Sequence, residues 1–155
     1  MRLAPVGFAA ELSAYAETYG PITLAVAGAG QMGTDLLVAL RRMPGLRLGA
    51  MCDRNPRIVF DAAAVTGGAE RLRPAANVAE IERAIEQGLV AVTDDIAALC
   101  AAGPVDVVVD ATGNPNTGAE VALAAIGNGK HLVMLNVEAD ITIGRWLKRE
   151  ASRAG

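Results

Sequence analysis

The sequence has few of the residues that mark metal or redox sites. Its 155 residues include one histidine and two cysteines, and only 3% are aromatic. Cys52 and Cys100 form no CxxC pair, so with a single histidine they cannot supply the four ligands of a structural zinc ion, and we expect no metal. Both should be free thiols in a reducing, cytoplasmic compartment. The scarcity of aromatic rings argues against stacking platforms for nucleic-acid bases.

An excess of positive charge and long apolar runs are also missing. Fourteen Lys and Arg residues stand against seventeen Asp and Glu residues, for a formal charge of −3. This balance predicts no nucleic-acid partner, since nothing would neutralise a phosphate backbone. No apolar run reaches the roughly 20 residues of a membrane span, and no signal-peptide pattern opens the chain, so we expect no membrane partner. At 52% hydrophobic and 20% charged residues, the composition excludes intrinsic disorder.

Strand and helix patterns alternate along the chain. Residues 3–19 show a helical stripe, and residues 66–76 read as a surface loop. Short apolar runs predict five buried parallel strands, at 22–27, 46–52, 90–93, 105–110 and 131–135. Helical patterns lie between or after them, at 36–42, 56–65, 78–89, 96–102, 117–126 and 143–154.

This alternation predicts an α/β fold, a Rossmann-type doubly wound parallel sheet in a three-layer sandwich. Numbered along the chain, the five strands should lie in the order 3-2-1-4-5. We expect two parts, an N-terminal helix over residues 1–20 and the Rossmann-type domain over residues 21–155.

Residues 28–33 fit the pattern G-x-G-x-x-G, directly after the first strand and at the start of a helix. In this pattern Gly28 permits a tight turn, Gly30 lets the backbone approach a pyrophosphate, and Gly33 packs the helix against the strand. Free N–H groups and the helix dipole would then face the phosphates. The alternative is a plain strand–turn–helix corner. The predicted cofactor-binding residues here are Gly28, Ala29, Gly30, Gln31, Met32 and Gly33.

Asp53 ends the second strand, 20 residues after Gly33. A carboxylate at this spacing accepts hydrogen bonds from the adenosine ribose and would repel a 2′-phosphate, which favours NAD. Arg54 and Arg57 could instead pair with that phosphate, which favours NADP, or be solvated surface charges. The predicted cofactor is therefore NADP or NAD. Asp53 could alternatively cap the helix that begins near Pro56.

The loop after the fourth strand should border the nicotinamide half of the cofactor, because ligands of open α/β sheets lie beyond the carboxyl ends of the strands. Ala111, Thr112 and Gly113 are the predicted contacts in this loop. Asp110, at the strand end, could equally satisfy backbone amides.

Residues 135–140 follow the fifth strand at the same edge. Their two carboxylates and one amide could bind substrate or a metal. We expect Asn136 to contact the cofactor, and Glu138 is the candidate catalytic residue. These polar side chains could instead cap the final helix.

Three stretches, residues 27–35, 110–113 and 129–144, resemble the NAD(P)-binding domain of homoserine dehydrogenase-like oxidoreductases. More narrowly they resemble the 1-deoxy-D-xylulose 5-phosphate reductoisomerase-like (DXR-like) proteins, and residues 129–144 are the specific signal. That resemblance implies NADPH-dependent reduction and rearrangement of a phosphorylated ketose in isoprenoid biosynthesis. It also implies a catalytic domain beyond residue 155 that binds substrate and mediates oligomerisation. Homoserine dehydrogenases have a lysine after the asparagine, where this chain has Val137, which argues against homoserine oxidation.

We therefore expect the NAD(P)-binding domain of an oxidoreductase that transfers hydride to or from a small, phosphorylated carbonyl substrate. The 155 residues alone should bind cofactor without turnover, because they lack a plausible acid–base set. The alternatives are the N-terminal domain of a homoserine dehydrogenase, a non-catalytic dinucleotide-sensing module, and an S-adenosylmethionine methyltransferase. Gly33 and residues 112–114 argue against the last. A homo-oligomer is also expected, since a missing neighbour domain would leave apolar surface bare.

Overall fold

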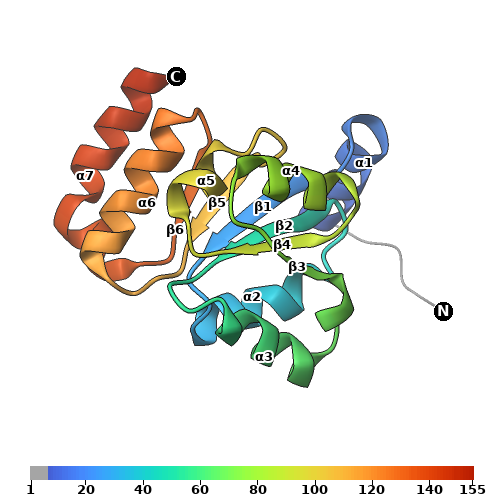
Figure 1. Ribbon diagram of the computed structural model, residues 1–155. Coiled ribbons are helices and arrows are strands. Elements are labelled where there is room, and N and C mark those ends of the chain that lie inside the picture. Colours follow the sequence, from blue (N-terminus) through green and yellow to red (C-terminus); the bar gives the residue numbers. More distant parts are fainter. Residues whose placement is uncertain (1–6) are drawn as a thin grey trace.

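A computed structural model of the protein describes residues 7–155. Its strands form one parallel sheet of six, in the order β3-β4-β2-β1-β5-β6 (Figure 1). The strands are β1 Ile22–Ala27, β2 Leu46–Cys52, β3 Leu72–Pro74, β4 Val90–Thr93, β5 Val107–Asp110 and β6 His131–Met134.

Helices cover both faces of this sheet and make the predicted three-layer sandwich (Figure 1). One face packs against α4, α5 and α6, the other against α2 and α3, while α7 lies beside α6. The helices are α1 Phe8–Tyr19, α2 Gln31–Leu40, α3 Arg57–Thr66, α4 Val78–Glu86, α5 Ile96–Ala101, α6 Pro115–Gly127 and α7 Val137–Ala154, with a short 3-10 turn at Ala69–Arg71. Within residues 7–155, no helix is long and apolar enough to span a membrane.

The central strand β1 shows why the sheet is covered on both sides. Ala25 and Ala27 pack into the core under α4, α5 and α6, whereas Leu24 and Val26 pack into the core under α2 and α3. All four side chains are buried. A strand buried on both faces needs a continuous apolar run, which is the pattern that predicted it.

The order of the five predicted strands is confirmed, but the prediction of a surface loop over residues 66–76 is wrong. That stretch contains the 3-10 turn and β3, which pairs with β4 through Leu72 opposite Val90. Leu72 is 3% exposed and belongs to the core. Three residues ending in proline are too short to show strand periodicity, so this edge strand left no pattern to detect.

Several helices begin earlier than predicted. Helix α2 starts at Gln31 rather than residue 36, and α7 starts at Val137 rather than residue 143. Their first turns contain glycine or polar residues that interrupt the apolar stripe, so periodicity detects only the later turns. Helix α1 begins at Phe8; residues 3–6 of the predicted helix lie outside the described residues.

The parallel strands bring the ends of β2, β1 and β5 to one edge of the sheet. In register, Ala27 lies opposite Cys52 on one side and Asp110 on the other. The chain runs from β1 to β2, β3 and β4 in one direction, and β5 then returns to the other side of β1. This reversal between β1 and β5 is where open α/β sheets bind their ligands.

Candidate cofactor site

The turn after β1 begins with Gly28, whose backbone only glycine adopts without strain. Its φ is +99°, and its N–H donates to the Cys52 carbonyl oxygen at 2.7 Å. A Cβ at this position would lie 2.6 Å from the Ala111 carbonyl oxygen in the loop after β5. The absence of a Cβ at Gly28 therefore allows the loop after β1 to contact the loop after β5.

The other two glycines of the motif have different surroundings. A Cβ on Gly33 would collide with the Gly28 carbonyl oxygen, so Gly33 sets how closely α2 packs against β1. A Cβ on Gly30 would meet no atom within 4 Å, so no packing requires glycine there. The open space at Gly30 fits a group that is not part of the protein.

Helix α2 begins without a side-chain cap. Gly30 is its N-cap, and the first backbone bond across the cap runs from the Thr34 N–H to the Gly30 carbonyl oxygen at 2.9 Å. Within the described chain, the N–H groups of Gln31, Met32 and Gly33 therefore have no acceptor. Unpartnered N–H groups at the positive end of a helix dipole bind anions.

Asp53 lies beside this turn, at the end of β2. One carboxylate oxygen accepts the Ala29 N–H at 2.8 Å and the other accepts the Asn55 N–H at 2.9 Å. Asp53 does not cap α3, whose N-cap is Pro56, so that alternative is wrong. The carboxylate is only half-buried, and its remaining lone pairs can accept further hydrogen bonds. Arg54 and Arg57 are exposed.

The loop after β5 is held by Asp110, which is fully buried. Its Oδ1 accepts from the Thr112 N–H at 3.0 Å and from the Thr112 hydroxyl at 2.7 Å. Its Oδ2 is buried without a hydrogen-bond partner in the described chain. Asp110 thus accepts a hydrogen bond from a backbone amide, which is the structural role predicted for it. The loop that it holds places Ala111 and Thr112 against Gly28.

Asn136 connects this loop to the final helix. It is 1% exposed and is the N-cap of α7, where its Oδ1 accepts the Ala139 N–H at 3.1 Å. Its Nδ2 donates to the Thr112 hydroxyl at 3.2 Å and to the Asn114 carbonyl oxygen at 2.9 Å. Both the amide nitrogen and the oxygen of this side chain are bonded inside the protein, so Asn136 holds the loop after β5 against the start of α7.

Glu138, the candidate catalytic residue, lies in the first turn of α7 rather than in a loop after β6. Acidic residues are favoured there by the helix dipole. Glu138 is exposed, and among residues 7–155 its side chain makes no hydrogen bond or ion pair.

Gly118 in α6 belongs to the same network and was missed. A Cβ there would lie 2.6 Å from Asn136 Nδ2 and 2.7 Å from Asp110 Oδ2. The signal in the sequence is a glycine inside a helix, which costs stability unless packing requires it.

Both cysteines are free thiols, as predicted, and both are buried, Cys52 at the end of β2 and Cys100 in α5. Burial, and secondarily the carboxylates of Asp53, Asp94 and Asp95, raises the pKa of Cys52 from 9.0 to about 12. Burial raises the pKa of Cys100 to about 11, although Lys130 lowers it slightly. Both thiols are therefore protonated and unreactive at neutral pH.

These pKa shifts predict a loss of stability in alkali. Above pH 9 the unfolded chain releases the thiol protons while the folded chain keeps them, so stability is complete below pH 9 and falls as pH rises toward 11–12. In that interval each thiol should lower the free energy of unfolding by about 1.4 kcal/mol for each pH unit. Urea denaturation from pH 8 to pH 11 measures the loss. The double variant Cys52→Ser, Cys100→Ser should lose less stability over this interval. If its free energy of unfolding fell with pH as steeply as that of the original protein, the two thiols would not cause the loss.

The family model for the NAD-binding domain of homoserine dehydrogenase matches residues 28–155. The chain belongs to this family. The predicted cofactor, NADP or NAD, is thus the cofactor class of the family. No curated protein sequence matches the chain closely enough to refine this assignment.

Several solved structures of oxidoreductases share the fold of this chain. A homoserine dehydrogenase from Thiobacillus denitrificans is 23% identical with a TM-score of 0.63, and the match covers 87% of this chain and 28% of that one. An oxidoreductase from Agrobacterium radiobacter, in complex with NAD+, L-tartaric acid and magnesium, is 19% identical with a TM-score of 0.64, covering 86% and 33%. Biliverdin reductase from Synechocystis, in complex with biliverdin and NADP+, is 21% identical with a TM-score of 0.61, covering 87% and 36%. The chain thus spans about a third of the length of these proteins.

Proposed function

We propose that this domain binds NAD or NADP over the carboxyl ends of β1 and β5, beside the start of α2, as the cofactor-binding part of a hydride-transferring oxidoreductase. The observation that carries the proposal is the uncapped start of α2, where three amides have no acceptor within residues 7–155 beside an open Gly30. A pyrophosphate supplies acceptors for these amides and negative charge for the helix dipole.

The residues around the start of α2 fit the rest of a dinucleotide. Asp53 keeps free lone pairs for ribose hydroxyls while it fixes the Ala29 amide. Thr112, held by Asp110, borders the turn on the β5 side, where a nicotinamide would lie. A bound nicotinamide dinucleotide supplies or accepts the hydride, and these residues fix its position and orientation.

Asp53 should decide between the two cofactors. We expect Asp53→Ser to lower affinity for NADH about tenfold, because a ribose acceptor is lost, and to raise the ratio of NADPH to NADH affinity by about thirtyfold, because a 2′-phosphate no longer meets a carboxylate. Fluorescence titration with both cofactors measures the ratio. Asp61→Ser, an exposed carboxylate on α3, is the matched control. An unchanged ratio in Asp53→Ser would show that the carboxylate does not contact the ribose.

Two reactions are candidates for the oxidoreductase that contains this domain, and different observations favour each. Family membership and the homoserine dehydrogenase from Thiobacillus denitrificans favour oxidation of a hydroxy acid such as homoserine. The resemblance of residues 129–144 to DXR-like proteins, and Val137 in place of a lysine, favour reduction of a phosphorylated carbonyl compound. Val137 is 61% exposed in the first turn of α7, so a lysine would have had room there.

We also propose that the substrate is held by a further domain of a longer chain, in the cytoplasm, and that residues 1–155 alone bind cofactor without turnover. Calorimetric titration with NADH, NADPH and S-adenosylmethionine tests the binding proposal. Binding of either dinucleotide supports it, and binding of S-adenosylmethionine alone would replace it with a methyltransferase. Steady-state oxidation of NADPH with any substrate by these 155 residues would overturn the proposal of binding without turnover. A longer chain that binds the cofactor but reduces nothing would instead indicate a sensing module.

A further inference from the structure

A pocket of about 220 Å³ lies at the amino ends of the strands, between the sheet and the end of α2. It is lined by Leu46, Leu72 and Val90, which are the first residues of β2, β3 and β4. Leu40 and Arg41 line it from the end of α2. The proposed cofactor site lies at the other ends of β2 and α2, so the two places are separated by the length of a strand and of a helix.

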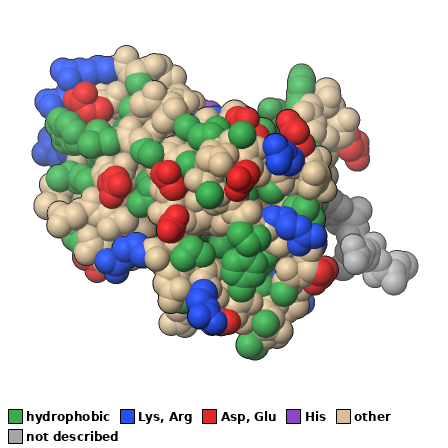
Figure 2. All heavy atoms as spheres, in the orientation of Figure 1, with side chains coloured by type: hydrophobic (Ala, Val, Ile, Leu, Met, Phe, Trp, Pro, Cys, Tyr) green, Lys and Arg blue, Asp and Glu red, His purple; other side chains and the backbone are tan. Residues whose placement is uncertain are grey.

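The floor of this pocket is apolar. It is formed by buried side chains of α2 and of three strands, Leu37, Leu40, Leu48, Leu72 and Val90. All five belong to the core between the sheet and helices α2 and α3. Figure 2 shows exposed hydrophobic side chains in the part of the molecule that contains α2, α3 and β3, with Lys and Arg side chains beside them. A ligand in this pocket would therefore place an apolar body against leucine and valine side chains.

Two exposed arginines line the same pocket, and each is fixed by one hydrogen bond to the backbone. Arg41 donates from Nη1 to the carbonyl oxygen of Thr66, at the end of α3, at 3.1 Å. Arg71 donates from Nη2 to the carbonyl oxygen of Gly88, in the turn before β4, at 2.9 Å. Because a guanidinium has five N–H donors, most donors of both side chains remain available to a ligand.

The glycine turn before β3 holds both arginines. A Cβ on Gly68 would lie 2.5 Å from Arg41 Nη2, so this guanidinium lies directly on the backbone of the turn. The Arg71 N–H donates to the Gly68 carbonyl oxygen at 3.1 Å. Gly68 has a φ of +86°, which glycine adopts without strain, and it also lines the pocket.

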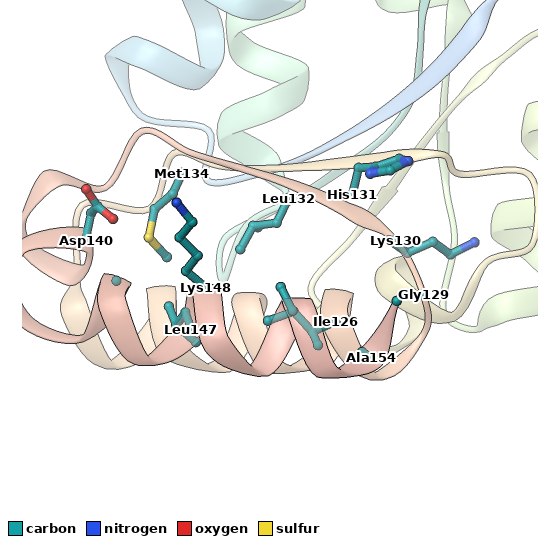
Figure 3. A pocket seen from close by; sticks show the side chains of 13 residues that line it. Ile126, Gly129, Lys130, His131, Leu132, Met134, Asp140, Leu147, Lys148 and Ala154 are labelled. Carbon is teal, nitrogen blue, oxygen red and sulfur yellow. The ribbon is translucent and has the colours of Figure 1, made fainter.

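No carboxylate offsets these two positive charges. The residues that line the pocket include no Asp or Glu, and among the described residues neither Arg41 nor Arg71 forms an ion pair. Residues 1–6 contain no acidic residue. By contrast, the pocket between β6 and α7 is lined by Asp140 as well as by Lys148 (Figure 3). The pocket at the end of α2 therefore favours an anion.

A third arginine on the lining, Arg47, is used inside the protein. Leu46 and Leu48, its neighbours on β2, pack on the α2 side of the sheet, so the side chain of Arg47 points to the opposite face. Its Nη2 donates to the Thr23 hydroxyl at 2.8 Å. The two arginines that can bind an anion in this pocket are thus Arg41 and Arg71.

We propose that this pocket binds a small organic carboxylate with a compact apolar body. A guanidinium pairs with a carboxylate through two parallel hydrogen bonds, which fix the orientation of the ligand as well as its charge. Since a cavity of about 150 Å³ holds benzene, one of about 220 Å³ has room for a ring or a branched chain together with its carboxylate. The proposal does not rest on the proposed function, because the pocket shares no residue with the cofactor site.

Two-dimensional ¹H–¹⁵N NMR of the labelled 155-residue chain, titrated with benzoate, tests this site. We expect the amide signals of Gly68 and Leu72 and the Nε–H signals of Arg41 and Arg71 to shift and saturate together, with a dissociation constant on the order of 1 mM. Benzamide has the same shape without the charge, and inorganic phosphate has charge without the apolar body. Each should bind about tenfold more weakly than benzoate, or less tightly still.

Variants of the two arginines test which side chains hold the carboxylate. Arg41→Gln and Arg71→Gln should each weaken benzoate binding about fivefold or more, and the double variant should show no saturation at about 20 mM benzoate. Arg42→Gln is the matched control, because Arg42 is exposed and adjacent to Arg41 but does not line the pocket. It should bind benzoate as the original chain does.

Several results would overturn the proposal. One is the absence of any saturable shift with benzoate, and another is a double variant that binds benzoate undiminished. Benzamide or phosphate binding as tightly as benzoate in the unsubstituted chain would do the same, and that comparison does not depend on how a variant folds. Shifts confined to the amides of residues 31–33 would place the carboxylate at the start of α2 instead.

Discussion

Replacing Gly30 with serine is expected to lower NADH affinity about 100-fold while leaving the domain as stable as before, or more stable. A Cβ at Gly30 meets no atom within 4 Å, so the fold accommodates the side chain. Serine is a preferred N-cap, and its hydroxyl can accept one of the amides at the start of α2, for a gain of about 0.5 kcal/mol. The same hydroxyl then occupies the place of the pyrophosphate, and a loss of about 2.7 kcal/mol in binding corresponds to 100-fold.

Unchanged or higher stability together with lower NADH affinity would show that Gly30 is needed for the ligand and not for the turn itself. Thermal unfolding and fluorescence titration of the Gly30→Ser variant measure the two quantities. Gly127→Ser is the matched control, because Gly127 also has open space at its Cβ position but lies at the end of α6. Undiminished NADH affinity in the Gly30→Ser variant would mean that the cofactor does not approach the start of α2.

Replacing Asn136 with aspartate is expected to lower the free energy of unfolding by about 3 kcal/mol or more. The cap of α7 survives, since a carboxylate oxygen still accepts the Ala139 N–H. The two donated bonds are lost, and a second buried carboxylate faces the Thr112 hydroxyl and the Asn114 carbonyl oxygen. Gly118 lies against both Asn136 and Asp110 Oδ2, and within residues 7–155 no Lys or Arg forms an ion pair with Asp110, so the added negative charge is not offset there.

Urea denaturation measures this loss, with Asn116→Asp as the control. Asn116 is exposed in the first turn of α6, where an added carboxylate should change stability by less than about 0.5 kcal/mol. A loss equal to that of the control would show that Asn136 serves only as a helix cap. In that case the loop after β5 would not depend on α7.

The sequence predicted the parts of the fold that depend on continuous apolar runs. Strands β1, β2, β4, β5 and β6, and their order, followed from such runs and from the rule that parallel connections are right-handed. It could not predict β3, because three residues show no period and their pairing with β4 is set by tertiary contact. It also misplaced the starts of α2 and α7, since caps and first turns carry little periodicity.

The part of the candidate site that could be predicted is the glycine turn after β1, because its backbone conformation depends on residues close together in the sequence. The spacing of Gly28, Gly30 and Gly33 gave the turn, and the structure assigns each glycine a different steric environment. The network of Asp110, Thr112 and Asn136 joins residues up to 26 positions apart, so no local pattern describes it. Such a network is visible only once β5 and β6 lie side by side.

The central claim is that the free amides of Gln31, Met32 and Gly33 hold the pyrophosphate of a dinucleotide. Two-dimensional ¹H–¹⁵N NMR of the labelled 155-residue chain, titrated with NAD+ or NADP+, tests it directly. The account predicts that the amide signals of these three residues and of Thr112 shift together and saturate with one binding constant. Saturating dinucleotide that leaves the three amide signals in place would contradict it.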